Sequence, residues 1–292
     1  MSAFKFAVNT NALKKKWTTA QIVEICCRAG ADGIEWGLTS LETASAEALE
    51  MHKLTSAAGL EVVGYLNAGL LWKIDLMRQW SEAVAAVKGK MLRVAPPWFA
   101  WNFDESLHQK DSFLELLGRS RAGLEALVPL AREYGIRYVV EIHAGNIAAS
   151  PWAIREMMRG LDPECVGAIY DPANTALEGF VRPSVACELL GKHLAYVHAK
   201  NLFLTLSPKY APVALPRRAQ WEASRAFLEQ GLIDYVEIFF ALKKSGFSGW
   251  ISMEEFASDD YSREIAEGIR FLKECAVAAP AETQEPYTKF ND

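Results

Sequence analysis

Four side chains that can bind a metal ion stand at the ends of short β-forming runs in the second half of the chain. Glu141 ends the run Tyr-Val-Val-Glu, Asp171 the run Ala-Ile-Tyr-Asp, His198 the run Ala-Tyr-Val-His and Glu254 the run Trp-Ile-Ser-Met-Glu. Three carboxylates brought together would raise one another's pKa values unless a cation lay among them. Three carboxylates and an imidazole suit Mn²⁺, Mg²⁺ or Co²⁺ better than an ion that prefers thiolates. The sequence therefore predicts a divalent metal site, provided that the fold brings these four ends together.

The elements that must position these residues alternate along the whole chain. Apolar runs typical of strands begin near residues 5, 32, 60, 91, 137, 166, 194 and 249, with helical patterns between them. This alternation predicts an α/β fold, a single-domain (β/α)8 TIM barrel over residues 1–278, with residues 279–292 as a peripheral tail. A doubly wound open sheet is the alternative, but no Gly-x-Gly-x-x-Gly follows any of these runs.

Local signals support the helices between the strands. Thr18 with Gln21 forms a capping-box pattern, and Ser150 followed by Pro151 is typical of the first turn of a helix. The spacing also locates two insertions, because the intervals after strands 4 and 7 are 46 and 55 residues, against 27 to 31 for the first three. Residues 97–110 and 202–220 should therefore lie at the C-terminal face of the barrel, as loops that cover the substrate.

Strand alternation predicts which side chains share the barrel interior. Glu141 and His143 fall on one side of their strand, as do His198 and Lys200, and Glu254 falls with Ser252. Any one acidic residue at a strand end is more often a solvated residue or a helix cap. Four ligand-type residues at matching positions of consecutive strands favour a shared metal site at the mouth of the barrel.

Composition excludes several classes of protein. A net charge of −5 and a pI near 5.7 argue against a nucleic-acid surface. The five cysteines have no Cys-x-x-Cys spacing, so a disulfide framework or a thiolate zinc site is not expected. No apolar run approaches the roughly 18 residues of a membrane span. These features predict a cytoplasmic enzyme that does not act on membranes.

The chain resembles the xylose isomerase-like TIM barrel superfamily, in the branch of ketose 3-epimerases, hydroxypyruvate isomerase and inosose dehydratase. The resemblance covers nearly all of residues 1–278 and is carried by residues 140–143, 170–174, 197–201 and 246–254, together with Gly231 and Asp234 of the Gly-x-x-Asp motif. It implies that Glu141, Asp171, His198 and Glu254 bind one divalent metal ion, with Mn²⁺ favoured and Mg²⁺, Co²⁺ or Zn²⁺ as alternatives. It also implies that Glu141 and Glu254 transfer protons.

The activity implied is isomerisation or epimerisation of a ketose or related polyhydroxy carbonyl compound through a metal-bound enediolate. Loss of a β-hydroxyl from the same enediolate would instead make the protein a dehydratase of a keto-inositol or keto-sugar, and the sequence does not choose between these outcomes. Ketose epimerases and hydroxypyruvate isomerase usually carry a histidine where this chain has Asn174. Asparagine can bind a hydroxyl group but cannot carry a proton.

Further residues are predicted to contact a sugar or polyol substrate, namely His143, Asn174, Lys200, Arg218 and Trp101. Glu35, at the end of the second strand, fits a place beside the substrate and a place in the barrel rim equally well. Two other functions remain open: a phosphodiesterase related to a DNA-repair endonuclease, for which five histidines are too few, and a sugar-binding barrel without turnover. The resemblance also implies a homodimer or homotetramer.

Overall fold

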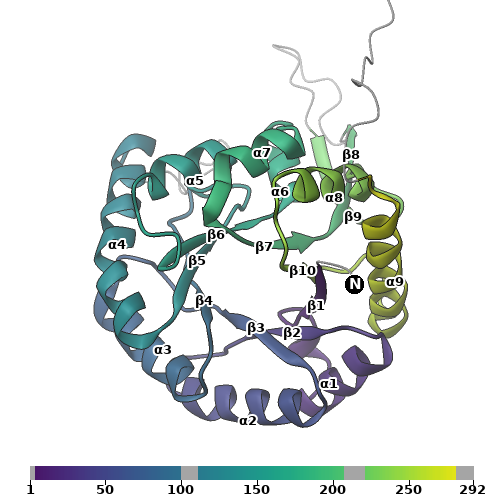
Figure 1. Cartoon of the computed structure of the whole chain (residues 1–292), viewed down its shortest axis with the longest axis horizontal. Helices are drawn as coiled ribbons and strands as arrows, with labels where there is room; N and C mark the ends of the chain where they lie inside the picture. Colours follow the sequence, from purple (N-terminus) through teal and green to yellow (C-terminus); the bar gives the residue numbers. More distant parts are fainter. Residues whose placement is uncertain (1–3, 100–110, 207–220, 281–292) are drawn as a thin grey trace, which may run out of the picture.

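The computed structural model describes residues 4–99, 111–206 and 221–280. Eight parallel strands close into a barrel in the order β1, β2, β3, β4, β5, β6, β7 and β10, and β10 pairs with β1 (Figure 1). Their bounds are Lys5–Asn9, Gly33–Gly37, Glu61–Leu66, Met91–Arg93, Arg137–Glu141, Val166–Tyr170, Leu194–Ala199 and Trp250–Met253. The predicted barrel is confirmed, and each strand begins within one residue of its predicted start.

Helices surround these strands in Figure 1. Their bounds are α1 Thr19–Arg28, α2 Ala44–Ala57, α3 Ile74–Ala86, α4 Phe113–Tyr134, α5 Pro151–Met158, α6 Pro172–Glu178, α7 Pro183–Leu190, α8 Tyr235–Lys244 and α9 Tyr261–Ala278, with the 3₁₀ turns η1 Leu13–Lys15 and η3 Gly191–His193. Both predicted caps form, because Thr18 makes a capping box with Gln21 and the Ser150 side chain accepts the Ala153 N–H. Within the described part of the chain, no helix has the length and apolar character that crossing a membrane requires.

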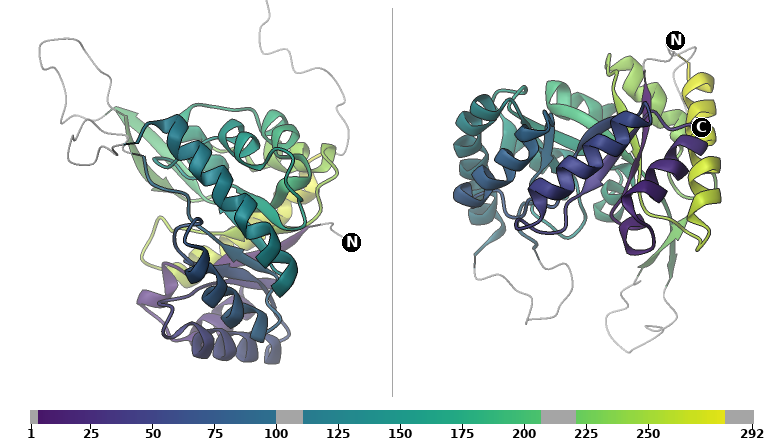
Figure 2. Two further views of the ribbon diagram at one scale, coloured as in Figure 1. Left: turned by 90° about the vertical axis from the view of Figure 1, so that its left-hand side faces the viewer. Right: turned by 90° about the horizontal axis from the view of Figure 1, so that it is seen from below.

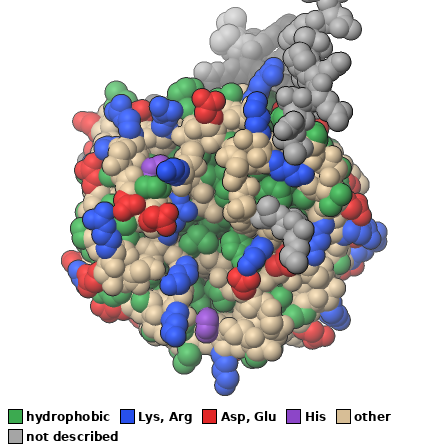
Figure 3. Space-filling model, in the orientation of Figure 1, with side chains coloured by type: hydrophobic (Ala, Val, Ile, Leu, Met, Phe, Trp, Pro, Cys, Tyr) green, Lys and Arg blue, Asp and Glu red, His purple; other side chains and the backbone are tan. Residues whose placement is uncertain are grey.

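The side chains of the strands divide between two apolar regions. On β5, Tyr138 and Val140 belong to the large core beneath the helices, whereas Val139 belongs to a smaller buried cluster that includes Ile169 and Tyr196. This alternation directs the next residue on the Val139 side, Glu141, into the barrel. In Figure 3, hydrophobic side chains gather at the centre of the face shown, and charged side chains lie mainly around it.

The spacing predicts a covering loop after β7, but the insertion there also contains two strands. Strands β8 (Asn201–Leu206) and β9 (Trp221–Ala226) pair with each other in an antiparallel ribbon outside the barrel sheet. The ribbon extends past the end of the barrel (Figure 2). The backbone groups of β8 and β9 form hydrogen bonds with each other. Strand spacing alone does not predict this pairing, because residues 207–220 separate the two strands.

The base of this ribbon is fixed by Asn201, which is 4% exposed. Its side-chain amide donates to the carbonyl groups of Leu228 at 2.7 Å and Ile233 at 3.0 Å, and its Oδ1 accepts the Ile233 N–H at 2.9 Å. Gly231 makes this approach sterically feasible, because a Cβ atom there would lie 2.2 Å from Asn201 Oδ1. Asp234 then caps α8, so the Gly-x-x-Asp motif connects the ribbon to the next helix.

Replacing Gly231 with alanine should therefore destabilise the protein by about 1–3 kcal/mol, because the added methyl group must displace Asn201. Gly118→Ala is the matched control, since Gly118 is exposed in α4 and a Cβ there meets nothing within 4 Å. That change should leave stability unchanged or raise it by up to ~1 kcal/mol. Denaturant unfolding curves measure both effects, and equal midpoints for Gly231→Ala and the wild type would contradict this account.

Candidate metal centre

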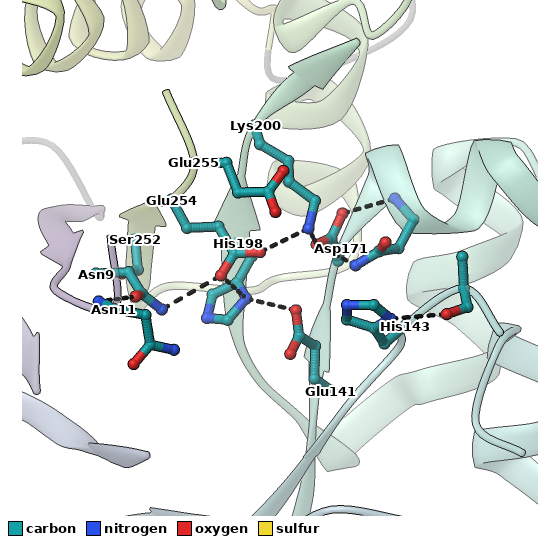
Figure 4. A network of polar contacts seen from close by, with 12 residues as sticks. Asn9, Asn11, Glu141, His143, Asp171, His198, Lys200, Ser252, Glu254 and Glu255 are labelled. Atoms are coloured by element: carbon teal, nitrogen blue, oxygen red, sulfur yellow. Dashed lines mark hydrogen bonds and ion pairs between the residues drawn. The ribbon is translucent and has the colours of Figure 1, made fainter. Parts of the chain in front are cut away.

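The structure brings Glu141, Asp171, His198 and Glu254 together at the C-terminal end of the barrel, here called the mouth. Glu141 is the last residue of β5, Asp171 follows β6, His198 lies on β7 and Glu254 follows β10. One potential ligand atom from each lies within 4.8 Å of the others, and all four residues are buried. Figure 4 shows these side chains converging from their separate strands. We call them the four-residue cluster.

His198 directs its Nδ1 toward the two glutamates of this cluster. Its Nδ1 is 3.0 Å from Glu141 Oε1 and 3.1 Å from Glu254 Oε2. Burial lowers the pKa of His198, but the carboxylates of Glu254, Glu35 and Glu141 outweigh burial and hold that pKa well above its usual value. The raised pKa favours the protonated imidazole, which must lose a proton to become a metal ligand.

The environments of the three carboxylates differ. Burial raises the pKa of Asp171 to about 7, an effect that Lys200 opposes and the neighbouring glutamates reinforce. Burial raises the pKa of Glu141, but the positive charges of Arg93 and His198 outweigh burial. The pKa of Glu141 is therefore lowered. His198 and Lys200 together overcome burial at Glu254 and hold its pKa well below the usual range.

Lys200 is brought to the cluster, as strand alternation predicts. Its Nζ lies 2.9 Å from Asp171 Oδ2 and 2.7 Å from Glu254 Oε1, with the residue 6% exposed (Figure 4). Burial lowers the pKa of Lys200, but the carboxylates of Asp171 and Glu254 outweigh burial and hold that pKa well above its usual value. The ammonium group is thus a fixed positive charge at the mouth.

Asn174 also lies at the mouth, but its polar groups are directed to Asp171. Its Nδ2 donates to Asp171 Oδ2 at 2.7 Å, and its backbone N–H donates to Oδ1 at 2.8 Å, which makes Asp171 the N-cap of α6. The side-chain amide therefore orients a carboxylate of the cluster. Contact of Asn174 with a substrate remains a prediction.

His143 lies on the Glu141 side of β5, beside the cluster (Figure 4). Its Nδ1 is 2.8 Å from the carbonyl oxygen of Ala144, and its ring meets Trp98 edge to face with centroids 5.0 Å apart. Trp98 is 58% exposed, so it offers an apolar surface at the mouth. Trp101 and Arg218, the other predicted substrate contacts, lie outside the described residues.

Sequence reasoning missed Arg93. This residue ends β4, and its Nη2 lies 2.8 Å from Glu141 Oε2, a buried oxygen that has no hydrogen bond of good geometry. Two residues earlier on the same strand, Met91 packs against the inner apolar cluster. The alternation that directs Glu141 inward also directs Arg93 inward and would have identified it.

Glu35 is a second residue whose place the sequence left open. It is fully buried and lies in the middle of β2, not at the end of the strand as predicted. Its carboxylate accepts hydrogen bonds from Tyr196 at 2.5 Å and Ser252 at 2.6 Å, and lies 3.0 Å from His198 Nε2. Glu35 therefore lies behind the imidazole, on the side away from Glu141 and Glu254.

The charge balance of this region fits a divalent cation. When ionised, Glu35 and the three carboxylates of the four-residue cluster carry four negative charges, while Arg93 and Lys200 supply two positive charges. With His198 as a neutral ligand, a doubly charged ion would balance the buried set. Uncompensated buried charge is costly, so the donor set fits a divalent ion better than a monovalent one.

Known proteins share this fold and part of this sequence. The chain is 29% identical to an inosose dehydratase of Geobacillus kaustophilus (strain HTA426) over 194 residues, which covers 62% of this chain and 61% of that protein. It is 27% identical to an inosose dehydratase of Bacillus licheniformis over 153 residues, or 49% of this chain and 48% of that protein. The matches thus span about half to three-fifths of the length of these curated relatives.

Solved structures show the same fold at lower identity. A 3-keto-D-glucoside 4-epimerase from E. coli superposes with a TM-score of 0.70 at 16% identity, covering 93% of this chain and 100% of that one. The IOLI protein with a bound zinc atom superposes with a TM-score of 0.68 at 18% identity, covering 94% and 96%. The family described as xylose isomerase-like TIM barrel matches residues 23–275. The chain therefore belongs to the xylose isomerase-like TIM barrel family.

Proposed function

We propose that this protein is a divalent-metal-dependent isomerase or epimerase that acts on a ketose or a related polyhydroxy carbonyl compound. The observation that carries the proposal is the pair of carboxylates, Glu141 and Glu254, that approach His198 Nδ1 from β5 and from the end of β10. Two carboxylates of one buried site can remove a proton from a carbon and return one to it. The epimerases among the structural neighbours support the same class of reaction.

The four-residue cluster would hold the ion, with Asp171 oriented by Asn174 and Glu141 by Arg93. A bound divalent ion polarises a carbonyl oxygen and acidifies the adjacent C–H group. We propose Mn²⁺, because the donors are mostly carboxylate oxygens, with Mg²⁺, Co²⁺ and Zn²⁺ as alternatives. The zinc atom in the IOLI protein supports a divalent ion in this fold.

The remaining side chains at the mouth suit a hydroxylated substrate. Lys200 supplies a fixed ammonium group, and His143 supplies a ring nitrogen opposite the one beside Ala144. Trp98 offers an apolar surface for the C–H face of a sugar. In this proposal Glu141 and Glu254 remove a proton from the substrate and return one to it. The hydroxyl groups and ring of the substrate are bound by Lys200, His143, Asn174, Trp101 and Arg218.

Dehydration of a keto-inositol or keto-sugar is the second candidate. It shares the first step, removal of a proton beside the carbonyl group, and differs in the loss of a β-hydroxyl. Two observations favour it: the sequence relatives are inosose dehydratases, and Asn174 stands where epimerases of this branch usually have a proton-carrying histidine. The five unpaired cysteines suit a reducing compartment, and we propose the cytoplasm for either activity.

Metal binding is the first expected property. The wild-type protein, stripped with chelator and titrated with Mn²⁺, Co²⁺ or Zn²⁺, should bind one ion per chain, because the four buried donors lie within reach of one centre. The double variant Glu141→Ala/Asp171→Ala should lose this binding. Glu255→Gln is the control, since Glu255 is exposed and outside the cluster. Calorimetry and elemental analysis measure the stoichiometry, and wild-type protein that binds no ion would contradict the proposed site.

Glu254→Gln should keep the fold and lower kcat by about 10²- to 10⁴-fold, because an amide cannot accept a proton from carbon. Turnover is measured by NMR in D₂O with a panel of ketoses, 3-keto sugars and inososes. Deuterium incorporation with inversion or carbonyl migration identifies the isomerase or epimerase, whereas a product lacking one water identifies the dehydratase. Full activity of Glu254→Gln would show that this carboxylate does not move the proton, and Glu255→Gln should match the wild type.

A further inference from the structure

Glu35 is enclosed by hydrogen-bond donors from three other barrel strands. Oε1 accepts from Tyr196 Oη at 2.5 Å, Oε2 accepts from Ser252 Oγ at 2.6 Å and from Asn9 Nδ2 at 3.1 Å, and His198 Nε2 lies 3.0 and 3.1 Å from the two oxygens. Glu35 is 0% exposed. A carboxylate with this set of neighbours acts purely as an acceptor.

We infer that Glu35 is a positioning residue that holds the His198 ring with Nε2–H toward itself and thereby presents Nδ1 as the metal-binding nitrogen. The inference rests on the metal centre proposed above and assigns Glu35 no contact with the ion or the substrate. Beyond that metal centre, the inference identifies Nδ1 as the ligand atom of His198 and Glu35 as the residue that selects this atom.

The geometry of the imidazole supports this assignment. Nδ1 lies on the side of Glu141 and Glu254, whereas Nε2 lies on the side of Glu35. A neutral imidazole has one N–H donor and one lone pair, and the hydrogen bond to one nitrogen decides which nitrogen remains free. Both nitrogens face carboxylates, but Glu141 and Glu254 belong to the proposed metal-binding cluster, whereas Glu35 does not. With an ion bound among the cluster carboxylates, Glu35 would remain the acceptor for the imidazole N–H, so the proton would stay on Nε2 and the lone pair of Nδ1 would face the ion.

Neighbouring contacts keep this arrangement rigid. The Tyr196 ring packs against the His198 ring with centroids 5.5 Å apart, while its hydroxyl group holds Glu35. Asn9 Nδ2 donates to Glu254 Oε2 at 3.2 Å (Figure 4) and to Glu35 Oε2 at 3.1 Å, so one amide links the positioning carboxylate to the cluster. The backbone register supports the same arrangement, because His198 pairs with Ser252 across β7 and β10.

The decisive variant is Glu35→Gln, which keeps the size of the side chain but removes its charge and places an NH₂ group among donors. Partners of this kind typically contribute 10- to 100-fold to metal affinity, so the dissociation constant for Zn²⁺, measured by competition with a chelator, should rise by about that factor. Glu35→Asp, which restores the carboxylate, should recover part of the affinity.

Thr55→Val is the matched control for the loss of a buried hydrogen bond near β2. Thr55 is fully buried and accepts the indole N–H of Trp36, the residue after Glu35, at 3.0 Å. This change should lower thermal stability and leave the Zn²⁺ dissociation constant at its wild-type value. A similar loss of affinity in both variants would show that Glu35 acts through general stability alone and would overturn the inference.

A second measurement does not depend on the variants folding. In wild-type protein labelled with ¹⁵N-histidine and loaded with Zn²⁺, the His198 signal, assigned with His198→Asn, should show a protonated Nε2 and a metal-bound Nδ1. Coordination through Nε2, or wild-type affinity in a folded Glu35→Gln protein, would overturn the inference while leaving the metal centre intact. Wild-type protein without metal binding would overturn both proposals.

Discussion

The rest of the mouth depends on one constraint: four carboxylates are buried together, and their charge must be compensated. Burial raises the pKa of Asp171 to about 7, whereas cationic neighbours lower the pKa of Glu141 and Glu254. Arg93 and Lys200 are those fixed cations, and His198 adds charge when protonated. An arrangement of this kind is costly as a purely structural feature, which supports the divalent ion and the proton transfer that we propose.

The barrel supplies the geometry that this chemistry needs. Parallel strands end at one face, so residues 57 positions apart, Glu141 and His198, meet at 3.0 Å. The strand register also places the residues around His198. Tyr196 lies two residues before His198 on β7, and Ser252 pairs with His198 across the sheet. Positioning by strands is more precise than positioning by loops, and it gives each carboxylate its own set of partners.

Family membership indicates the fold, whereas the reaction depends on the side chains of the site. The xylose isomerase-like barrel gives the fold, but the relatives and structural neighbours include both inosose dehydratases and epimerases. We propose that the shared step, proton removal beside a carbonyl group, uses the pair Glu141 and Glu254. In this proposal, the outcome after that step depends on which group acts on the next carbon. Asn174 cannot carry a proton, and its amide donates to Asp171.

The sequence by itself determined the periodic alternation of strands and helices, and hence the barrel, the strand starts and the convergence of the four-residue cluster. Strand ends and side-chain alternation are local properties, so they could be read from residues such as Glu141 and His198. Tertiary structure alone decided the partners: which nitrogen of His198 faces Glu35, that Arg93 reaches Glu141, and that β8 pairs with β9. These contacts join residues distant in the chain. Alternation places Arg93 inside the barrel, but the partner that each side chain meets depends on barrel register and packing.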